Sequence, residues 1–467
     1  MAFYRYIIYG IIGTIPLLFA AVNPWVWPVY TACIFILFIS LLWQNHIQWK
    51  PFSSAVISIT IGFFFIWTCF QYLPLPPSML AFLSSFRYQI VEKTYALNGV
   101  QNSWQALSYA PFTSLSWWIF LLSLCAFFSV VTKLFLSRRH LRVLIWIMIS
   151  VAIVEAVYGL MQALVPSIGV LWVDSVYAYI GNARGTFINR NHFAGFMEMT
   201  LPLALGYTMS LGNWKTKKRL KAILASDRFN LMLFFFIASV IMVLSLVFSR
   251  SRAGIGGAAI GLLTFIILIR SRATRFPLGF WIMATIFCGL FVMYGSRIGF
   301  MRVIDRFLEI STEASRLDVW HDSCAMVKDH PLGVGLDSFN VVFPVYRVTT
   351  HGDVFYKYAH NDYLQLLIET GWPGFLALVA AFYIFLGKSG KKIVQLSPQR
   401  DPFSFFVGIG AFSGLISIAF HSFFDFNLHI PANCVYFVTL LSMVYLCAWK
   451  TEAVEVSMKN KDLWTHD

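Results

Sequence analysis

The stretch Asn230-Leu-Met-Leu-Phe-Phe-Phe-Ile-Ala-Ser-Val-Ile-Met-Val-Leu-Ser-Leu-Val-Phe-Ser249 runs for twenty residues without a charged side chain. An α-helix needs about 20 apolar residues to cross the hydrocarbon core of a bilayer. Similar runs recur on both sides of this one, and the whole chain is 58% hydrophobic and only 12% charged. A soluble domain carries roughly 25% charged residues. The sequence therefore predicts an all-α integral membrane protein.

We expect about twelve transmembrane helices. Their approximate bounds are 6–22, 28–43, 53–73, 115–136, 143–165, 191–211, 230–249, 253–269, 277–295, 372–387, 403–421 and 431–449. The first run has no clear signal-peptidase site and is interpreted as an uncleaved span. The chain then divides into helices one to nine (1–295), a large loop (296–371), helices ten to twelve (372–449) and a tail (450–467).

Lysine and arginine predict the orientation, because they are enriched in cytoplasmic loops. With both termini inside, the predicted cytoplasmic segments hold 22 of the 35 Lys and Arg residues. The loop 296–371 then lies on the outer side. Seven of the ten histidines fall there or at the outer membrane edge: His192, His321, His330, His351, His360, His421 and His429. A protein that served only as an anchor would have no reason to collect imidazoles on one face.

The net charge of +14 does not indicate a nucleic-acid partner, because the basic residues are dispersed among short loops between apolar runs. The seven cysteines lie mostly inside apolar runs and show neither C-x-x-C nor disulfide spacing. The outer histidines lack the H-x-x-x-H or H-E-x-x-H spacing of zinc sites. The sequence thus predicts contact with membrane lipids and gives no support for a metal.

Two arginines stand in a tight outer turn where the orientation predicts few basic residues. Arg250 and Arg252 lie between the runs 230–249 and 253–269. An arginine at a helix centre costs about 2.5–3.5 kcal/mol on insertion scales, and less near the edge. A bound anion would offset that cost, and the planar guanidinium suits phosphate. The alternative is that both side chains extend to lipid headgroups.

A second polar stretch, Gly181-Asn-Ala-Arg-Gly-Thr-Phe-Ile-Asn-Arg-Asn-His192, precedes the sixth run. It holds Arg184 in a glycine- and asparagine-rich segment, with Asn189 and His192 at the mouth of the next helix. A helix N-terminus presents unpaired N–H groups that attract anions. The stretch fits an ordinary polar turn with a helix cap equally well.

The loop 296–371 is too long for a simple connection, since loops beyond about 12–15 residues are usually functional or disordered. Apolar residues at helical spacing indicate that it is folded, and Arg316 and Trp320 share one helix face. A break at Gly371-Trp-Pro373 separates it from the tenth span. The later run His421–Pro431 is interpreted as a tight structural turn that borders the site.

Near the end of this loop, Tyr358-Ala-His360-Asn361-Asp362 opens a short amphipathic helix. Asn361 and Asp362 are candidates for its N-cap. An imidazole at this point can take a proton near neutral pH, and Asp362 or Glu369 are candidates to orient it. His360 is therefore the candidate catalytic residue, while an ordinary loop histidine is the alternative.

These segments resemble the O-antigen ligase and polymerase superfamily of bacterial membrane glycosyltransferases over roughly residues 150–440. The match is carried by six motifs in order: Arg184-Gly-Thr-Phe-Ile-Asn189, Ser251-Arg252-Ala-Gly254, Asp329-His-Pro-Leu-Gly-Val-Gly335, Ala359-His360-Asn-Asp-Tyr-Leu-Gln365, Glu369-Thr-Gly371 and His421-Ser-Phe-Phe-Asp425. The histidine motif is fairly specific, whereas each arginine motif alone is weak.

The resemblance implies a helical fold in the bacterial inner membrane, N-in and C-in, with a large, partly helical periplasmic loop between spans nine and ten. It implies a donor glycan on undecaprenyl diphosphate, an acceptor on lipid A–core or another lipid-linked glycan, and no cofactor, metal or ATP. His360 matches the family's proposed general base, and Arg184 and Arg252 match its diphosphate-binding residues. Arg250 joins them as a candidate, and Arg316, Asn361, Asp362, Asn189 and His192 are candidate supporting residues.

Several functions remain open on the sequence. The favoured one is an O-antigen ligase, which uses lipid A–core as acceptor. A polymerase of the same superfamily would use a lipid-linked repeat unit, and a protein O-oligosaccharyltransferase is a third possibility. A flippase or transporter of lipid-linked glycans also has about twelve spans, but such proteins usually show internal repeats and midplane charges. A structural membrane scaffold is the remaining alternative.

Overall fold

The computed structural model describes residues 1–46, 54–99, 103–165, 167–173, 180–212, 226–272, 311–349 and 355–450. Every regular element within these ranges is helical, in agreement with the predicted all-α class. Nine of the helices in these ranges are long and apolar enough to cross a bilayer. They are α2 (Val26–Trp43), α3 (Ala55–Tyr72), α6 (Pro111–Leu134), α7 (Arg138–Leu164), α10 (Asp227–Ser249), α11 (Arg252–Arg270), α16 (Asp362–Gln395), α17 (Pro402–His421) and α18 (Pro431–Tyr445), which a π-helical turn extends.

The predicted count of twelve spans is not confirmed. The first predicted span is interrupted, because α1 (Ala2–Thr14) has 13 residues and precedes a separate 3-10 turn, η1 (Phe19–Ala21), with Ala20 at φ 54°. The predicted span 277–295 lies outside the described residues. The sixth predicted span corresponds to α8 (Arg190–Ser210), which is long enough to cross but is not among the nine apolar helices.

The central position of α8 explains its lower hydropathy. It packs against α7, α10, α11, α17 and α18, and nearly all of its side chains are buried. Because protein surrounds it, α8 accommodates the buried Glu198 and the internal Pro202. Polar groups at membrane depth are tolerated where they face protein instead of lipid.

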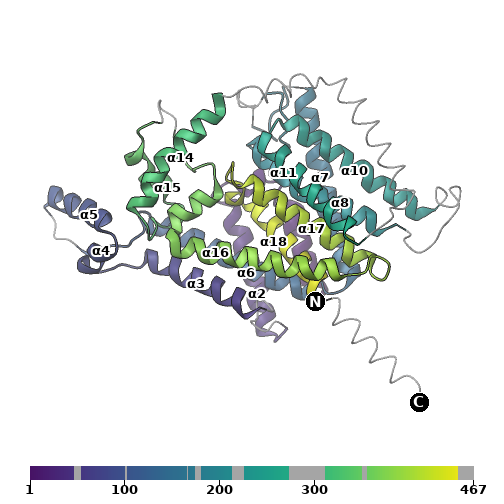
Figure 1. The fold of residues 1–467 in the computed structure, drawn as a ribbon, viewed down its shortest axis with the longest axis horizontal. Helices are drawn as coiled ribbons and strands as arrows, with labels where there is room; N and C mark the ends of the chain where they lie inside the picture. Colours follow the sequence, from purple (N-terminus) through teal and green to yellow (C-terminus); the bar gives the residue numbers. More distant parts are fainter. Residues whose placement is uncertain are drawn as a thin grey trace, which may run out of the picture.

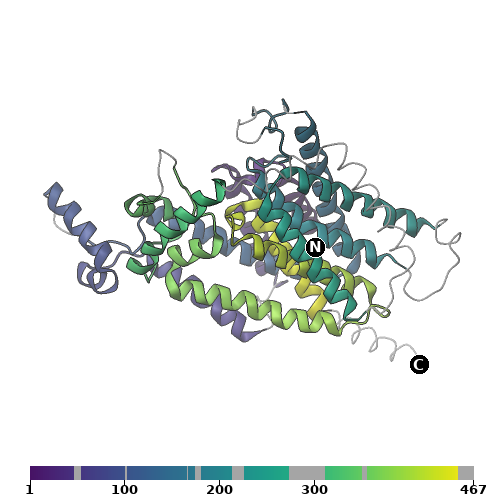
Figure 2. The ribbon, with the colours of Figure 1, turned by 45° about the horizontal axis from the view of Figure 1, so that its top comes forward.

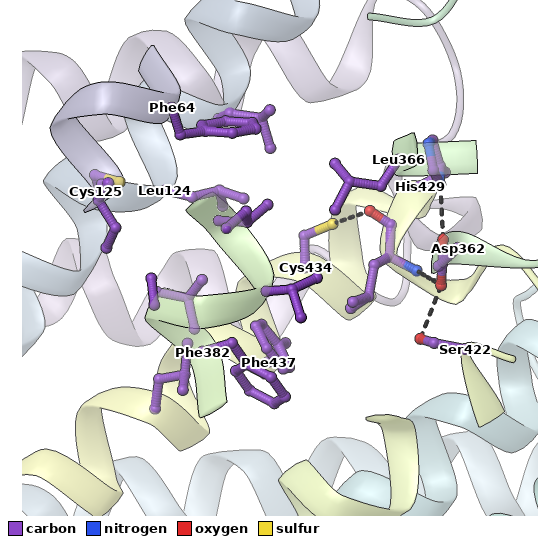
Figure 3. Close-up of a pocket in the computed structure, with 18 of the residues that line it drawn as sticks. Phe64, Leu124, Cys125, Asp362, Leu366, Phe382, Ser422, His429, Cys434 and Phe437 are labelled. Carbon is purple, nitrogen blue, oxygen red and sulfur yellow. Dashed lines mark hydrogen bonds and ion pairs between the residues drawn. The ribbon is translucent and has the colours of Figure 1, made fainter. Parts of the chain in front are cut away.

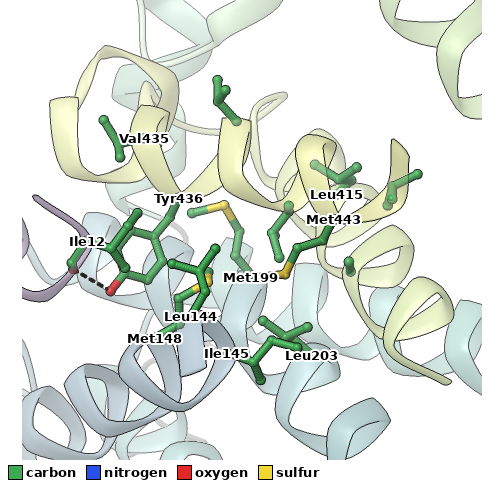
Figure 4. Close-up of a cluster of buried hydrophobic side chains, with 14 of the residues drawn as sticks. Ile12, Leu144, Ile145, Met148, Met199, Leu203, Leu415, Val435, Tyr436 and Met443 are labelled. Carbon is green, nitrogen blue, oxygen red and sulfur yellow. Dashed lines mark hydrogen bonds between the residues drawn. The ribbon is translucent and has the colours of Figure 1, made fainter. Parts of the chain in front are cut away.

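The hydrophobic core lies where α7, α8, α17 and α18 meet (Figure 4). Met148 of α7, Met199 of α8 and Tyr436 of α18 are all buried there, and the Tyr436 hydroxyl donates to the Ile12 carbonyl of α1 over 3.0 Å. Close approach of α8 and α17 depends on Gly410, where an added Cβ would press against the Pro202 carbonyl. Small residues at such crossings let membrane helices pack backbone to backbone.

The loop helices gather at one end of the bundle. In both ribbon views, α4 (Pro77–Leu83), α5 (Ser85–Asn98), α14 (Ser311–Asp329) and α15 (Phe339–Val342) lie beyond the start of α16 (Figures 1 and 2). The predicted break before the tenth span appears as a kink in α16, where Gly371 has a φ of 65° and a ψ of 179°.

The opposite end of the bundle carries basic side chains of the predicted cytoplasmic segments. There, at the start of α7, Arg138 donates to Asp401 over 2.6 Å. Lys388, late in α16, donates to Ser54 at the start of α3 over 2.9 Å. His360, which precedes the first residue of α16, therefore lies at the other end of the same long helix. The fold thus separates the histidine motif from these basic side chains by the length of the bundle.

Candidate functional site

The start of α16 and the turn after α17 are joined by backbone hydrogen bonds, and this joint positions His360. Asn361 caps α16, since its side-chain oxygen accepts from the N–H groups of Tyr363 and Leu364 at 3.1 and 3.0 Å. The N–H of Asp362 donates to the carbonyls of Ser422 and Asp425. His360 itself has a φ of 52°. A non-glycine residue in this region is uncommon and often marks a functional position.

His360 is paired with Asp425. Its Nδ1 lies 3.3 Å from Oδ1 of Asp425, whose side chain is fully buried, whereas the imidazole keeps 28% of its surface exposed. Asn191 donates to Oδ2 of the same carboxylate over 2.6 Å, and the Phe426 N–H donates to Oδ1 over 2.9 Å. The Asp425 carboxylate is thus held in place by hydrogen bonds to both of its oxygens. It contacts Nδ1 of His360 and so orients the imidazole ring.

The orienting acid differs from the one that the sequence indicated. We expected Asp362 or Glu369 to orient His360, and the structure places Asp425 there instead. That residue lies 65 positions further along the chain, in a run interpreted as a structural turn. The available signal was a single acidic residue between His421 and His429, in a stretch with three phenylalanines.

One guanidinium and two imidazoles surround the Asp425 carboxylate. Nη2 of Arg316 lies 3.4 Å from its Oδ2, while Nη1 of Arg316 donates to the Phe424 carbonyl over 2.7 Å. Nε2 of His192 lies 3.9 Å from its Oδ1. Burial alone would raise the pKa of the Asp425 carboxyl, but the hydrogen bond and charge of His360, with those of Arg316 and His192, lower that pKa well below its usual value. The carboxylate therefore stays ionised beside His360.

Arg316 and Trp320 reach the site together, as their shared helix face predicted. The Trp320 indole donates to the Ala359 carbonyl over 2.9 Å, immediately before His360. Helix α14 thus contacts both the segment before α16, through Trp320, and the turn after α17, through Arg316. Helix α14 is therefore packed on the candidate site, and His360 is held between α14 and the turn after α17.

Asp362 forms a second histidine–carboxylate pair. Its Oδ1 lies 2.8 Å from Nδ1 of His429, and its Oδ2 accepts from the Ser422 hydroxyl and the Leu428 N–H at 2.9 and 3.1 Å (Figure 3). Burial would lower the pKa of His429, but Asp362, followed by Glu369 and Asp337, raises it above its usual value. The two pairs are crossed: His360, two residues before α16, binds Asp425, whereas Asp362, the first residue of α16, binds His429 of the same turn.

Arg184 lies in a buried loop between α7 and α8. The loop is anchored by the Ala183 N–H, which donates to the Phe248 carbonyl over 2.9 Å, and by the Arg184 N–H, which donates to the Gln162 side chain over 3.2 Å. The Arg184 side chain is almost completely buried. Asn189 caps the following helix, since its side-chain oxygen accepts from the Asn191 N–H over 2.9 Å.

Arg250 and Arg252 flank the junction of α10 and α11. Arg250 ends α10 in a left-handed conformation, with a φ of 54°, and Arg252 is the first residue of α11.

Two contacts join this junction to α8 and to the loop of Arg184. Gly254 packs against Ala194 of α8, so the first turns of α11 and α8 touch. The Phe248 carbonyl receives the Ala183 bond, so the loop of Arg184 meets the end of α10. The structure thus brings the loop of Arg184 and the junction that carries Arg250 and Arg252 together at the start of α8, where His192 lies. Arg316, from α14, contacts Asp425.

Metal ligation has no support in the part of the chain that the structure describes. No group of three or more His, Cys, Asp or Glu side chains there is arranged to hold an ion. The paired histidines instead each meet a carboxylate, which suits proton transfer and hydrogen bonding to substrate. The absence of a metal from the reaction stays a prediction.

Residues 237–379 match the family model described as O-antigen ligase. The matched segment includes Arg250, Arg252, Arg316 and His360, whereas Asp425 lies beyond its end. No curated protein sequence matches the chain.

Proposed function

We propose that the chain is a glycosyltransferase of the O-antigen ligase and polymerase superfamily, which moves a glycan from an undecaprenyl-diphosphate donor to an acceptor hydroxyl. The match of residues 237–379 to the O-antigen ligase family model supports this proposal. The match and the nine apolar helices of the described ranges support a multi-pass membrane enzyme of the glycosyltransferase type. The observation that carries the proposal is the contact between the partly exposed His360 and the buried Asp425.

His360 is the general base of the proposed reaction. The ionised Asp425 favours the tautomer with the proton on Nδ1, which leaves the lone pair of Nε2 to accept the proton of the acceptor hydroxyl. The acceptor oxygen attacks the anomeric carbon, its proton passes to Nε2, and the bond between that carbon and the diphosphate breaks. The imidazolium that forms is stabilised by the ionised Asp425, as in other histidine–carboxylate pairs. A positioned base of this kind contributes about 10²–10⁴-fold to the rate.

Arg184, Arg250 and Arg252 would hold the diphosphate. Their segments meet at the adjoining first turns of α8 and α11, and helix N-termini favour bound anions through their free N–H groups. Charge on the leaving group grows as the bond breaks, so preorganised guanidinium groups stabilise the transition state more than the ground state. Arg316 and His192 support the site by their contacts with Asp425.

The proposed location is the bacterial inner membrane, with both termini in the cytoplasm and His360 on the periplasmic side. Its support is that the basic side chains of α7 and late α16 lie at the end of the bundle opposite His360. Lys and Arg are enriched on the cytoplasmic side of membrane proteins. We expect neither a metal nor a cofactor to take part.

The acceptor that we propose is lipid A–core, which makes the chain an O-antigen ligase. The test is the surface glycan of a strain that lacks the gene. A ligase predicts core without any attached O-antigen, and the wild-type chain restores the long glycan. Core that carries a single repeat unit would instead identify a polymerase, and unchanged glycan would contradict both.

A further inference from the structure

An apolar chamber lies between α3, α6, α16 and α18, on the far side of Asp362 from His360. Its volume is about 300 Å³, at the lower end of the range of about 300–1,000 Å³ for small-molecule sites. Side chains from all four helices form its walls, among them Phe64, Leu124, Phe382 and Phe437 (Figure 3). These four helices are membrane spans by length and composition, so the chamber is lined by helices that pass through the hydrocarbon region.

One end of the chamber is polar. Asp337, Asp362, Glu369 and His429 all line it, and three of these four groups are acids. Asp337 has a φ of 54°, in the left-handed region that Asp adopts more readily than most residues. Figure 3 shows Asp362 and His429 together at one side of the space and the aromatic and aliphatic side chains around the rest. The chamber is therefore amphiphilic, with an acidic end.

Aromatic rings separate this polar end from His360. The ring of Phe426 packs at 4.8 Å from His360 and at 4.5 Å from Tyr358, and Tyr358 in turn packs at 4.9 Å from His429. The two crossed histidine–carboxylate pairs thus lie back to back across these rings. The His360–Asp425 pair contacts Arg316 and His192, whereas the Asp362–His429 pair lines the chamber.

We infer that the chamber binds one hydrocarbon chain of an uncharged, hydroxyl-ended lipid, with the hydroxyl at the Asp362–His429 pair. Apolar walls favour the chain by the hydrophobic effect. Carboxylates accept hydrogen bonds from a hydroxyl. Because three acids and a single histidine line this end of the chamber, the acids repel a phosphate at the same position. The chamber therefore selects against the anionic headgroup that the arginine segments would attract. This site goes beyond the proposed glycan transfer and does not rest on it.

Two photoreactive lipids with the same chain test the inference. Purified protein in phosphatidylcholine vesicles is irradiated with a diazirine-bearing hexadecanol or with the corresponding hexadecyl phosphate, and the labelled peptides are found by mass spectrometry. We expect the alcohol to label the peptides that contain Leu124 and Phe437 at least fivefold more than the phosphate does. Equal labelling of these peptides by both probes would overturn the inference.

A matched pair of substitutions on one helix controls for labelling from the surrounding lipid. Ile61 of α3 lines the chamber, whereas Ile66 of the same helix is 72% exposed on the outside. Ile61→Trp is expected to fill the chamber and to abolish alcohol labelling of the Leu124 and Phe437 peptides, and Ile66→Trp to leave it unchanged. Persistent labelling in a folded Ile61→Trp protein contradicts the inference.

A third variant separates this inference from the proposed function. His360→Ala is expected to lose glycan transfer and to keep alcohol labelling, because Phe426 and Tyr358 lie between His360 and the chamber. The comparison of the two probes in the wild-type protein needs no transfer activity at all. If no glycan transfer is detected, the labelling experiment still tests the chamber. If the alcohol does not label the chamber, the transfer assay still tests His360 as the general base.

Discussion

Nδ1 of His360 lies 3.3 Å from Oδ1 of Asp425, and this contact joins the start of α16 to the turn after α17. The carboxylate is fully buried and the imidazole is partly exposed. One partner is thus held by the protein while the other remains open to a substrate. The arrangement orients the ring and keeps a negative charge beside it, which are the two requirements of a histidine base.

Removal of the charge on Asp425 should impair transfer without removing the side chain. Asp425→Asn keeps an oxygen that accepts a hydrogen bond but loses the charge that stabilises the imidazolium. We expect the transfer rate to fall by about 10²–10⁴-fold, the range of a general base, as measured with purified protein in liposomes. Asp318→Asn, in α14, is the control and should retain the wild-type rate. Wild-type transfer by a folded Asp425→Asn protein would exclude the carboxylate from catalysis.

Exchange of one cation for another should distinguish phosphate binding from simple charge. Arg252→Lys keeps the positive charge at the start of α11 but loses the planar fork that binds phosphate in a bidentate manner. We expect a loss of transfer of at least tenfold. Arg270→Lys, at the exposed other end of the same helix, should behave as wild type. Full activity of Arg252→Lys would count against direct contact with the diphosphate.

The Asp362–His429 pair should make stability depend on pH. The pKa of His429 is raised above its usual value of 6.5 in the folded protein. A raised pKa contributes stability that is fully present below pH 6.5 and is lost as the pH rises through the folded value. The wild-type Tm should therefore fall relative to that of His429→Gln as the pH increases above 6.5. Parallel Tm profiles of the two proteins would contradict the pairing.

The crossing of α8 and α17 should not tolerate a single added methyl group. Gly410→Ala places a Cβ against the Pro202 carbonyl, and overpacking of this kind costs about 1–3 kcal/mol. Gly387→Ala is the matched control on α16, because no atom lies within 4 Å of its Cβ position. We expect a lower Tm for Gly410→Ala and an unchanged or slightly higher Tm for Gly387→Ala. A wild-type Tm for Gly410→Ala would show that the two helices are less closely packed.

The sequence predicted the features that depend on local composition. Apolar runs such as 230–249 appear as helices, and Asn361 caps the helix that follows His360. The kink at Gly371 also follows from local chemistry, since glycine readily adopts a positive φ. Arg316 and Trp320 reach the same region because helical periodicity places them on one face.

The features that sequence reasoning missed depend on the packing of distant segments. Asp425 is adjacent to His360 only because α17 returns to the start of α16, and a contact across 65 residues has no local signal. Asp362 was a candidate partner of His360 by proximity in the chain, but it binds His429 on the other side of the joint. The burial of α8 likewise depends on its neighbours, so hydropathy alone did not show that it is central.

The most direct test of the account is the rate of glycan transfer by His360→Ala in liposomes that contain the lipid-linked donor and the acceptor. His321→Ala is the control, since its imidazole is 76% exposed on α14. If His360 is the general base, His360→Ala folds with a wild-type Tm and loses transfer by at least about 10²-fold, while His321→Ala transfers normally. Transfer at the wild-type rate by His360→Ala would contradict the central claim that this histidine is the base.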